Sequence, residues 1–314
     1  MKRIHAIPLV FTMLWLGQAN VSLAAFAPGE ILLVSRSTTV SRYLPSGVRV
    51  QTYVGADGPW KGLSLTPQGN FVTNRTNPIG IDTFDPSGSQ IGSFNVSPLL
   101  AYPSDVSVFA DGTLAINAAN SRILFYSPSG TLLRFATYPS FLPTPRGSTV
   151  GTDNTLYVSF QNSTGISRVT EGGTFLTDIP TNFLVGDVVM HPTDGTLWAT
   201  GSATGTITHL STTGTVLGSF PTGLPVGHPD IEGGDFLGIG IAPDGSSLYA
   251  TTGSSTVIRH FDLSGNQLGD FNIVSPNGPT FMTVVPGSVS APEPTSAALL
   301  LGGGALLAPR RRRG

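Results

Sequence analysis

The chain contains no cysteine among its 314 residues. This absence excludes disulfide bonds, thiol catalysis and metal sites built on cysteine. Charged residues are also scarce, at 11% of the chain against about 25% in an average domain. A folded form of this chain must therefore be held together by its apolar core and its backbone hydrogen bonds.

Basic residues are the scarcer of the two charge classes. Between Ala25 and Pro292 the sequence has ten lysines and arginines against seventeen aspartates and glutamates. Nucleic-acid binding requires a basic patch, so nucleic acid is not an expected partner. Acidic polymers would be repelled at low salt, whereas neutral glycans would not. The sequence also lacks the Gly-x-Ser-x-Gly, Walker and dinucleotide-binding motifs.

Turn-forming residues are abundant, with 39 glycines and 25 prolines. The stretch from Tyr102 to Thr137 shows how they are arranged. Asp111-Gly112 and Ser129-Gly130 separate short runs of alternating apolar and polar residues. An Asp-Gly pair between such runs is a strong signal for a β-hairpin. The stretch therefore predicts a four-stranded antiparallel sheet.

This unit recurs along the chain. Its first turns follow one another at 40 to 43 residues, apart from one gap of 50. The second turns carry a glycine each, at Gly47, Gly88, Gly130, Gly173, Gly214 and Gly265. Seven residues before each of these glycines stands a valine or an isoleucine. A period near 42 with four strands per unit is typical of propeller blades, so the sequence predicts an all-β, six-bladed β-propeller.

The first blade lacks a segment for its innermost strand, because its first turn, Pro28-Gly29, lies close to the start of the repeat region. Residues 281–285 match the innermost strand of the unit described above. We therefore expect this C-terminal strand to complete the first blade and close the ring, which would satisfy otherwise open backbone edges. The expected propeller domain spans residues 25–287.

Blade three carries the segment Asn120-Ser121-Arg122-Ile123, followed by Tyr126 and Gly130. This pattern resembles the NHL repeat. Residues 25–287 as a whole resemble a divergent six-bladed propeller of the NHL, strictosidine-synthase-like or gluconolactonase-like kind. Membership of the gluconolactonase-like group would imply a divalent metal held in the channel by carboxylate and asparagine ligands. A calcium ion would want about six or more oxygen ligands, and only two aspartates recur in register, so no cofactor is expected, with a divalent metal such as calcium as the alternative.

Four charged residues are predicted at one mouth of the channel, where the innermost strands begin. They are Lys61, Asp105, Arg146 and Asp187. This ring could bind a polar ligand. The alternative is that these charges pair with one another and serve only the structure.

The long gap between turns places about eight extra residues in a loop at residues 223–235. The loop contains His228, Asp230, Glu232 and Asp235. A histidine among carboxylates can bind a metal or act as acid and base, while the alternative is a polar surface loop. His209 and His260 share a register that varies from blade to blade, and we expect them to be exposed.

The N-terminal residues 1–24 have the layout of a secretory signal peptide. Lys2 and Arg3 precede an apolar stretch, and Ser22 and Ala24 are small residues at the positions that precede cleavage. This pattern predicts export through the Sec translocon, with cleavage after Ala24. The alternative is an uncleaved membrane anchor.

The C-terminal segment, residues 288–314, has three parts. Pro292, Glu293 and Pro294 are followed by the apolar run 297–308, and the chain then ends in Arg310, Arg311, Arg312, Arg313 and Gly314. As a helix, this run would span roughly 18 Å, short of the ~30 Å hydrocarbon core. The tail resembles the PEP-CTERM sorting signal of Gram-negative bacteria. That resemblance implies a short transmembrane helix, processing by an exosortase and association with exopolysaccharide or biofilm matrix.

Together these features predict an exported, non-catalytic binding or structural propeller. Its expected route is Sec export, transient anchoring in the inner membrane, and release to the outer surface or extracellular matrix of a Gram-negative bacterium. Its expected partners are an exosortase and a polysaccharide or envelope protein. The alternative function is a channel-mouth hydrolase or lyase of lactonase type with a divalent metal.

Overall fold

The computed structural model describes residues 25–35, 38–55, 58–96, 103–138, 144–160, 163–225, 237–253, 255–273 and 279–287. These ranges are built from strands and turns, and none of them contains a helix long and apolar enough to cross a membrane. The predicted signal peptide, the predicted sorting tail and the four residues of the predicted loop site lie outside the described residues.

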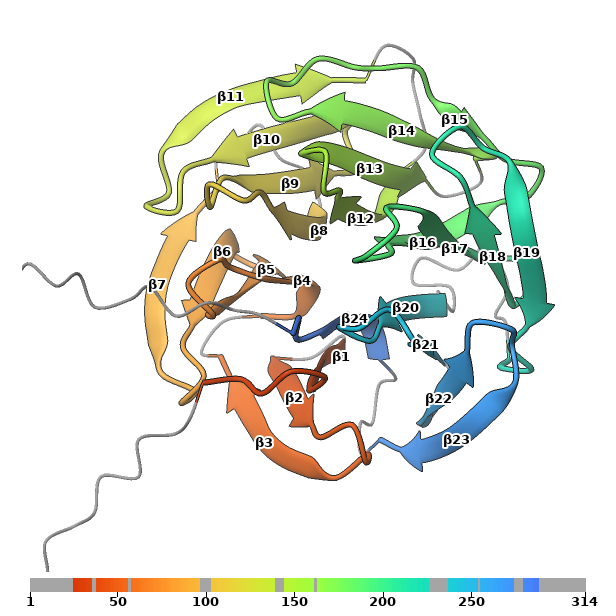
Figure 1. Ribbon diagram of the computed structural model, residues 1–314. Coiled ribbons are helices and arrows are strands. Elements are labelled where there is room, and N and C mark those ends of the chain that lie inside the picture. Colours follow the sequence, from red (N-terminus) through yellow and green to blue (C-terminus); the bar gives the residue numbers. More distant parts are fainter. Residues whose placement is uncertain are drawn as a thin grey trace, which may run out of the picture.

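Six four-stranded antiparallel sheets surround a central axis (Figure 1), as the repeat predicted. From centre to rim, the first three sheets are β24 (Pro279–Val284), β1 (Ile31–Ser35), β2 (Thr39–Tyr43), β3 (Arg49–Val54); β4 (Trp60–Leu65), β5 (Phe71–Thr76), β6 (Ile79–Phe84), β7 (Gln90–Asn95); and β8 (Pro103–Val108), β9 (Leu114–Ala118), β10 (Arg122–Tyr126), β11 (Leu132–Thr137).

The remaining three sheets follow the same order. They are β12 (Pro145–Val150), β13 (Thr155–Phe160), β14 (Gly165–Thr170), β15 (Ile179–Pro180); β16 (Val185–Met190), β17 (Leu197–Gly201), β18 (Thr206–Leu210), β19 (Val216–Pro221); and β20 (Leu237–Ile241), β21 (Ser247–Thr252), β22 (Val257–Asp262), β23 (Gln267–Asn272). We number the blades one to six from the sheet that contains β1.

The C-terminal strand closes the ring, which confirms the sequence prediction. β24 pairs with β1 in antiparallel register from Ile31↔Val284 to Val34↔Phe281. Beyond the strands, Gly29 N–H donates to the Val285 carbonyl at 2.9 Å, and Val285 N–H donates to the Glu30 carbonyl at 2.8 Å. Blade one is therefore made from both ends of the propeller domain.

The second turn of every blade needs glycine for two reasons. All six glycines have φ between 83° and 97°, a left-handed conformation that side chains disfavour. Each glycine also faces the outer strand of the preceding blade, and a Cβ on it would lie 2.3–3.7 Å from the side chain there. The pairs are Tyr53–Gly88, Phe94–Gly130, Ala136–Gly173, Ile179–Gly214, Phe220–Gly265 and Phe271–Gly47. This series of contacts runs around the whole disc.

The core consists of six apolar clusters, each drawn mainly from two neighbouring blades. In the cluster between blades one and two, Phe71 stacks on Phe84 with ring centroids 5.1 Å apart and meets Tyr53 edge-on. Burial of such side chains contributes roughly 1.5–3 kcal/mol each. The disc is therefore stabilised blade against blade, and its centre is left for the channel.

The outer strands of five blades share a β-bulge. The extra residue is aliphatic and 47–55% exposed in each case, at Val50, Ile91, Leu133, Leu217 and Leu268. Blade four differs, because its outer strand β15 is only two residues long. The rim is thus regular except at this blade.

Candidate functional site

The channel mouth is set by one register position near the start of each innermost strand, which is the third residue of five strands and the second residue of β20. Glycine alternates there with a larger residue from blade to blade. Starting from blade two, the order is Gly62, Asp105, Gly147, Asp187, Gly238 and Phe281. The channel therefore receives three side chains at this level, two of them carboxylates.

The glycines leave the space that the aspartates occupy. A Cβ added to Gly147 would lie 1.8 Å from Oδ1 of Asp187, and one added to Gly62 would lie 2.6 Å from Oδ1 of Asp105. Each aspartate is thus packed against the glycine of the blade before it. Both are buried, with 4% of Asp105 and 7% of Asp187 exposed.

Each aspartate also binds the blade that follows it. Oδ2 of Asp105 accepts hydrogen bonds from the backbone N–H and the hydroxyl of Ser148, both at 2.8 Å. Oδ2 of Asp187 accepts one from Ile239 N–H at 3.2 Å, and its Oδ1 accepts one from Val188 N–H at 2.8 Å. The two side chains therefore connect blade three to blade four and blade five to blade six.

Burial makes the charged form of both carboxyls unfavourable. It raises the pKa of Asp187 to about 7, although the hydrogen bonds that its carboxyl accepts from Ile239 N–H and Val188 N–H act to lower this pKa. The pKa of Asp105 is raised well above its usual range, first by burial and then by the negative charge of Asp187. At neutral pH the two carboxyl groups in the channel are therefore not both fully ionised.

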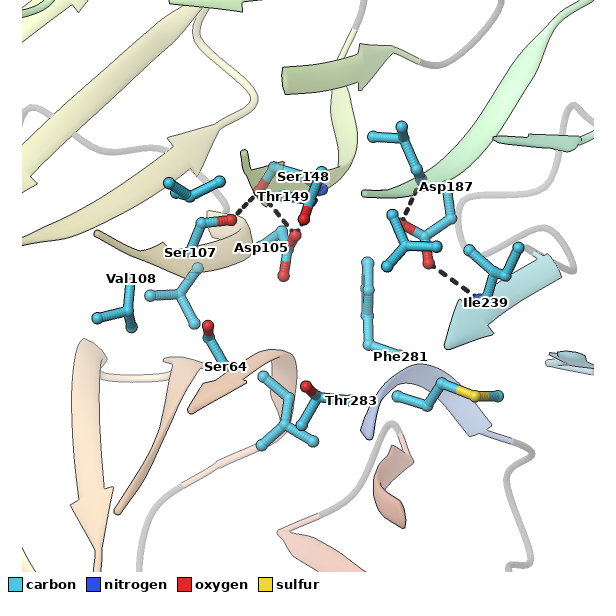
Figure 2. A pocket seen from close by; sticks show the side chains of 16 residues that line it. Ser64, Asp105, Ser107, Val108, Ser148, Thr149, Asp187, Ile239, Phe281 and Thr283 are labelled. Atoms are coloured by element: carbon cyan, nitrogen blue, oxygen red, sulfur yellow. Dashed lines mark hydrogen bonds between the residues drawn. The ribbon is translucent and has the colours of Figure 1, made fainter. Parts of the chain in front are cut away.

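A pocket of about 170 Å³ lies inside the ring of innermost strands, and both aspartates are among the residues that line it. Both carboxyls point into it, and the ring of Phe281 stands between them in the view of Figure 2. The other polar lining groups are hydroxyls, from Ser64, Ser107, Ser148, Thr149 and Thr283. Two of these, Ser107 and Ser148, bond each other at 2.8 Å.

The structure brings together two of the four predicted mouth residues. Asp105 and Asp187 line the pocket, whereas Lys61 and Arg146 occupy the preceding position on β4 and β12 and are not among the lining residues. A ligand-binding role for the four stays a prediction. The sequence analysis missed the hydroxyl lining and Phe281, although extending the strand alignment by two residues would have shown the serines and threonines.

The donor set does not fit a tightly bound calcium ion. Within the described ranges, no three histidine or acidic side chains are grouped closely enough to hold a metal. Asp105 and Asp187 already accept backbone N–H groups, and calcium needs about six or more oxygens.

No known protein family matches the sequence, and no curated protein matches it either. Solved structures match the fold. A protein of unknown function from Bacteroides caccae is 12% identical with a TM-score of 0.63, over 82% of this chain and 99% of that one. A chain of the nidogen–laminin complex is 15% identical with a TM-score of 0.64, over 82% and 99%.

An enzyme also shares the fold. A catalytically inactive histidine-to-alanine variant of virginiamycin B lyase from Staphylococcus aureus, solved with quinupristin, is 18% identical with a TM-score of 0.59. The match covers 80% of this chain and 86% of the lyase. At these identities the likeness extends to the propeller fold alone, and a fold of this kind hosts many functions.

Proposed function

We propose that this chain is an exported, non-catalytic β-propeller of the cell envelope or extracellular matrix, which binds a partner or serves as a structural disc. In this proposal the Sec translocon exports it and an exosortase processes its PEP-CTERM-like tail. The carrying observation is that Asp105 and Asp187 each bind the backbone of the following blade. The carboxyls that could do chemistry in the channel thus already hold the disc together.

The composition and one of the structural neighbours support a binding role. The acidic balance of the propeller disfavours acidic partners and leaves neutral glycans and proteins. The nidogen–laminin complex provides an example of a propeller of similar fold in a protein complex.

Export and processing can be tested together by fractionating the producing cells and determining the mass of the mature protein. We expect a product that lacks residues 1–24 and the arginines at 310–313, recovered from the outer surface or matrix. A mature protein with an intact Arg310–Arg313 end would contradict processing, and recovery from the cytoplasm would contradict export.

A lactonase- or lyase-type activity is the second candidate. It is favoured by the pKa of Asp187 of about 7, which suits a group that exchanges protons near neutral pH. The fold shared with virginiamycin B lyase points the same way. The test is turnover of a lactone panel and of quinupristin by the wild type and by Asp187→Asn. Turnover abolished by the substitution would replace the non-catalytic proposal, and no turnover by the wild type would remove this candidate.

A further inference from the structure

Blade four carries a second pocket, at the rim and away from the channel. Its volume is about 350 Å³, and it lies between β14 and the segment that leads into β15. The polar groups that line it include Ser163, Thr164, Ser167, Thr177 and Asp178, and Phe160 forms part of its apolar surface. Pockets for small ligands start at about this volume.

The pocket coincides with a gap in the pairing of β14 and β15, where two cross-strand pairs that the other blades form are missing. At the same register in the other blades, the third and fourth strands are paired, as in Ser41↔Thr52, Asp82↔Ser93, Leu124↔Phe135, Thr208↔Ser219 and Arg259↔Asp270. In blade four the residues at this register are Ser167 and Asp178. Pairing stops at Ile166↔Ile179 and resumes at Val169↔Phe175, and the pocket lies between these points.

In three other blades this pair is joined by a polar side-chain contact. Ser93 donates to Asp82 at 2.9 Å, Ser219 and Thr208 bond at 3.2 Å, and Arg259 pairs with Asp270 at 3.1 Å. In the described part of the chain, the side chains of Ser167 and Asp178 form no such bond. Both residues line the pocket, so their hydrogen-bonding groups are available to a ligand there.

A buried hydroxyl lies behind Phe160, although its residue, Tyr138, is not among those that line the pocket. Tyr138 is 4% exposed, packs edge-on against Phe160 at 4.7 Å, and its hydroxyl has no hydrogen-bond partner among the described residues. Burial and the negative charge of nearby Asp178 raise the pKa of this hydroxyl well above its usual range. A buried polar group without a partner costs about 1–3 kcal/mol, which a bound ligand or water can relieve.

We propose that this pocket binds one sugar unit of a neutral polysaccharide, with the carboxylate of Asp178 and the hydroxyl of Ser167 as hydrogen-bonding groups. A pyranose presents several hydroxyls as donors and acceptors and one apolar ring face. The pocket offers the complement: one carboxylate acceptor, several hydroxyls and an aromatic wall. A metal ion fits poorly, because a single carboxylate supplies few of the roughly six oxygens that calcium needs. An anionic sugar would be repelled by Asp178.

Saturation-transfer NMR with the full-length chain tests this proposal. The protein is purified in a detergent without a sugar headgroup, and the probes are methyl α-D-glucopyranoside, methyl α-D-galactopyranoside and N-acetylglucosamine. We expect transfer to at least one probe. Asp178→Ala and Ser167→Ala should each weaken binding about tenfold or more, because each removes a hydrogen bond made in a partly buried site.

Matched controls come from the same register in other blades. Asp270→Ala and Ser219→Ala should leave binding unchanged, because those side chains are engaged within their own sheets. The proposal is overturned if no probe receives transfer, or if Asp178→Ala and Ser167→Ala bind as the wild type does. It rests on the proposed binding function but fails separately, since a protein exported and processed as proposed could still bind no sugar here.

Discussion

Gly147 and Asp187 lie on adjacent blades, and the carboxylate of Asp187 fills the space that a side chain at residue 147 would require. A Cβ at residue 147 would come within 1.8 Å of Oδ1 of Asp187 and 2.7 Å of its Cγ. The glycine and the aspartate are therefore one packing unit, in which the smaller residue admits the larger.

Gly147→Ala should lower the free energy of unfolding by about 1–3 kcal/mol, as overpacking of a filled interior does. The added methyl must displace the Asp187 carboxyl, whose Oδ1 accepts a hydrogen bond from Val188 N–H and whose Oδ2 accepts one from Ile239 N–H. Thermal unfolding measures the effect. The matched control is Gly218→Ala on β19, where a Cβ would meet no atom within 4 Å. Equal melting temperatures for the two variants would show that the channel mouth is not packed as described.

The raised pKa of Asp187 predicts how stability changes with pH. The folded state holds this proton more tightly than the unfolded chain, whose aspartates titrate near about 3.9. The free energy of unfolding should therefore fall as the pH rises from about 4 to about 7, by up to roughly 4 kcal/mol from this group.

Urea unfolding at a series of pH values tests this prediction, with Asp187→Asn as the comparison. The variant should show a shallower decline between about pH 4 and 7, because its amide does not titrate and because loss of the Asp187 charge also reduces the rise in the pKa of Asp105. Burial lowers the pKa of His209 and of His260, so their titration acts below about 6.5 and in the opposite direction. This histidine contribution is the same in the wild type and in Asp187→Asn, so it cancels when the two free energies of unfolding are subtracted. Parallel pH profiles would contradict the assignment.

A disulfide between β1 and β24 should strengthen the ring closure. Leu33 and Met282 are register partners, and no native cysteine can compete with the pair Leu33→Cys and Met282→Cys. The bond would close a loop of nearly the whole propeller and could add up to about 5 kcal/mol. The melting temperature of the double variant should rise on oxidation and return on reduction, and no difference would argue against stable pairing of these strands.

His209 stacks on Trp198, with ring centroids 4.2 Å apart and planes 1° from parallel. Protonation of the imidazole should quench indole fluorescence, because the charged ring accepts an electron from the excited indole. Burial lowers the pKa of His209, so the fluorescence should titrate below about pH 6.5. His209→Gln should remove the titration, and a midpoint above that pH would contradict the described burial.

The fold was predictable because each blade repeats the same local chemistry. Asp111-Gly112 and Gly130 marked the hairpins of blade three, and the six second-turn glycines marked the number of blades. Even the closing strand followed from comparing residues 281–285 with blade three. Strand ends were less predictable, since Asp105, placed by the sequence where an innermost strand begins, is the third residue of β8 (Pro103–Val108).

The site was only partly predictable, because it depends on which blade faces which. Asp105 and Asp187 were singled out by their register, but their bonds to Ser148 and Ile239 link different blades and leave no local trace in the sequence. The expectation that His209 and His260 are exposed was wrong. Both are half-buried, because each stacks on the aromatic residue opposite it, Trp198 or Tyr249.

Blade one is assembled from the two extremes of the propeller, so biosynthesis cannot finish the disc piece by piece. A nascent chain halted before residue 279 would leave β1 with a bare edge, and the other five sheets would have nothing to lock them into a circle. Delivery of the last strand is therefore the event that commits this protein to its final shape.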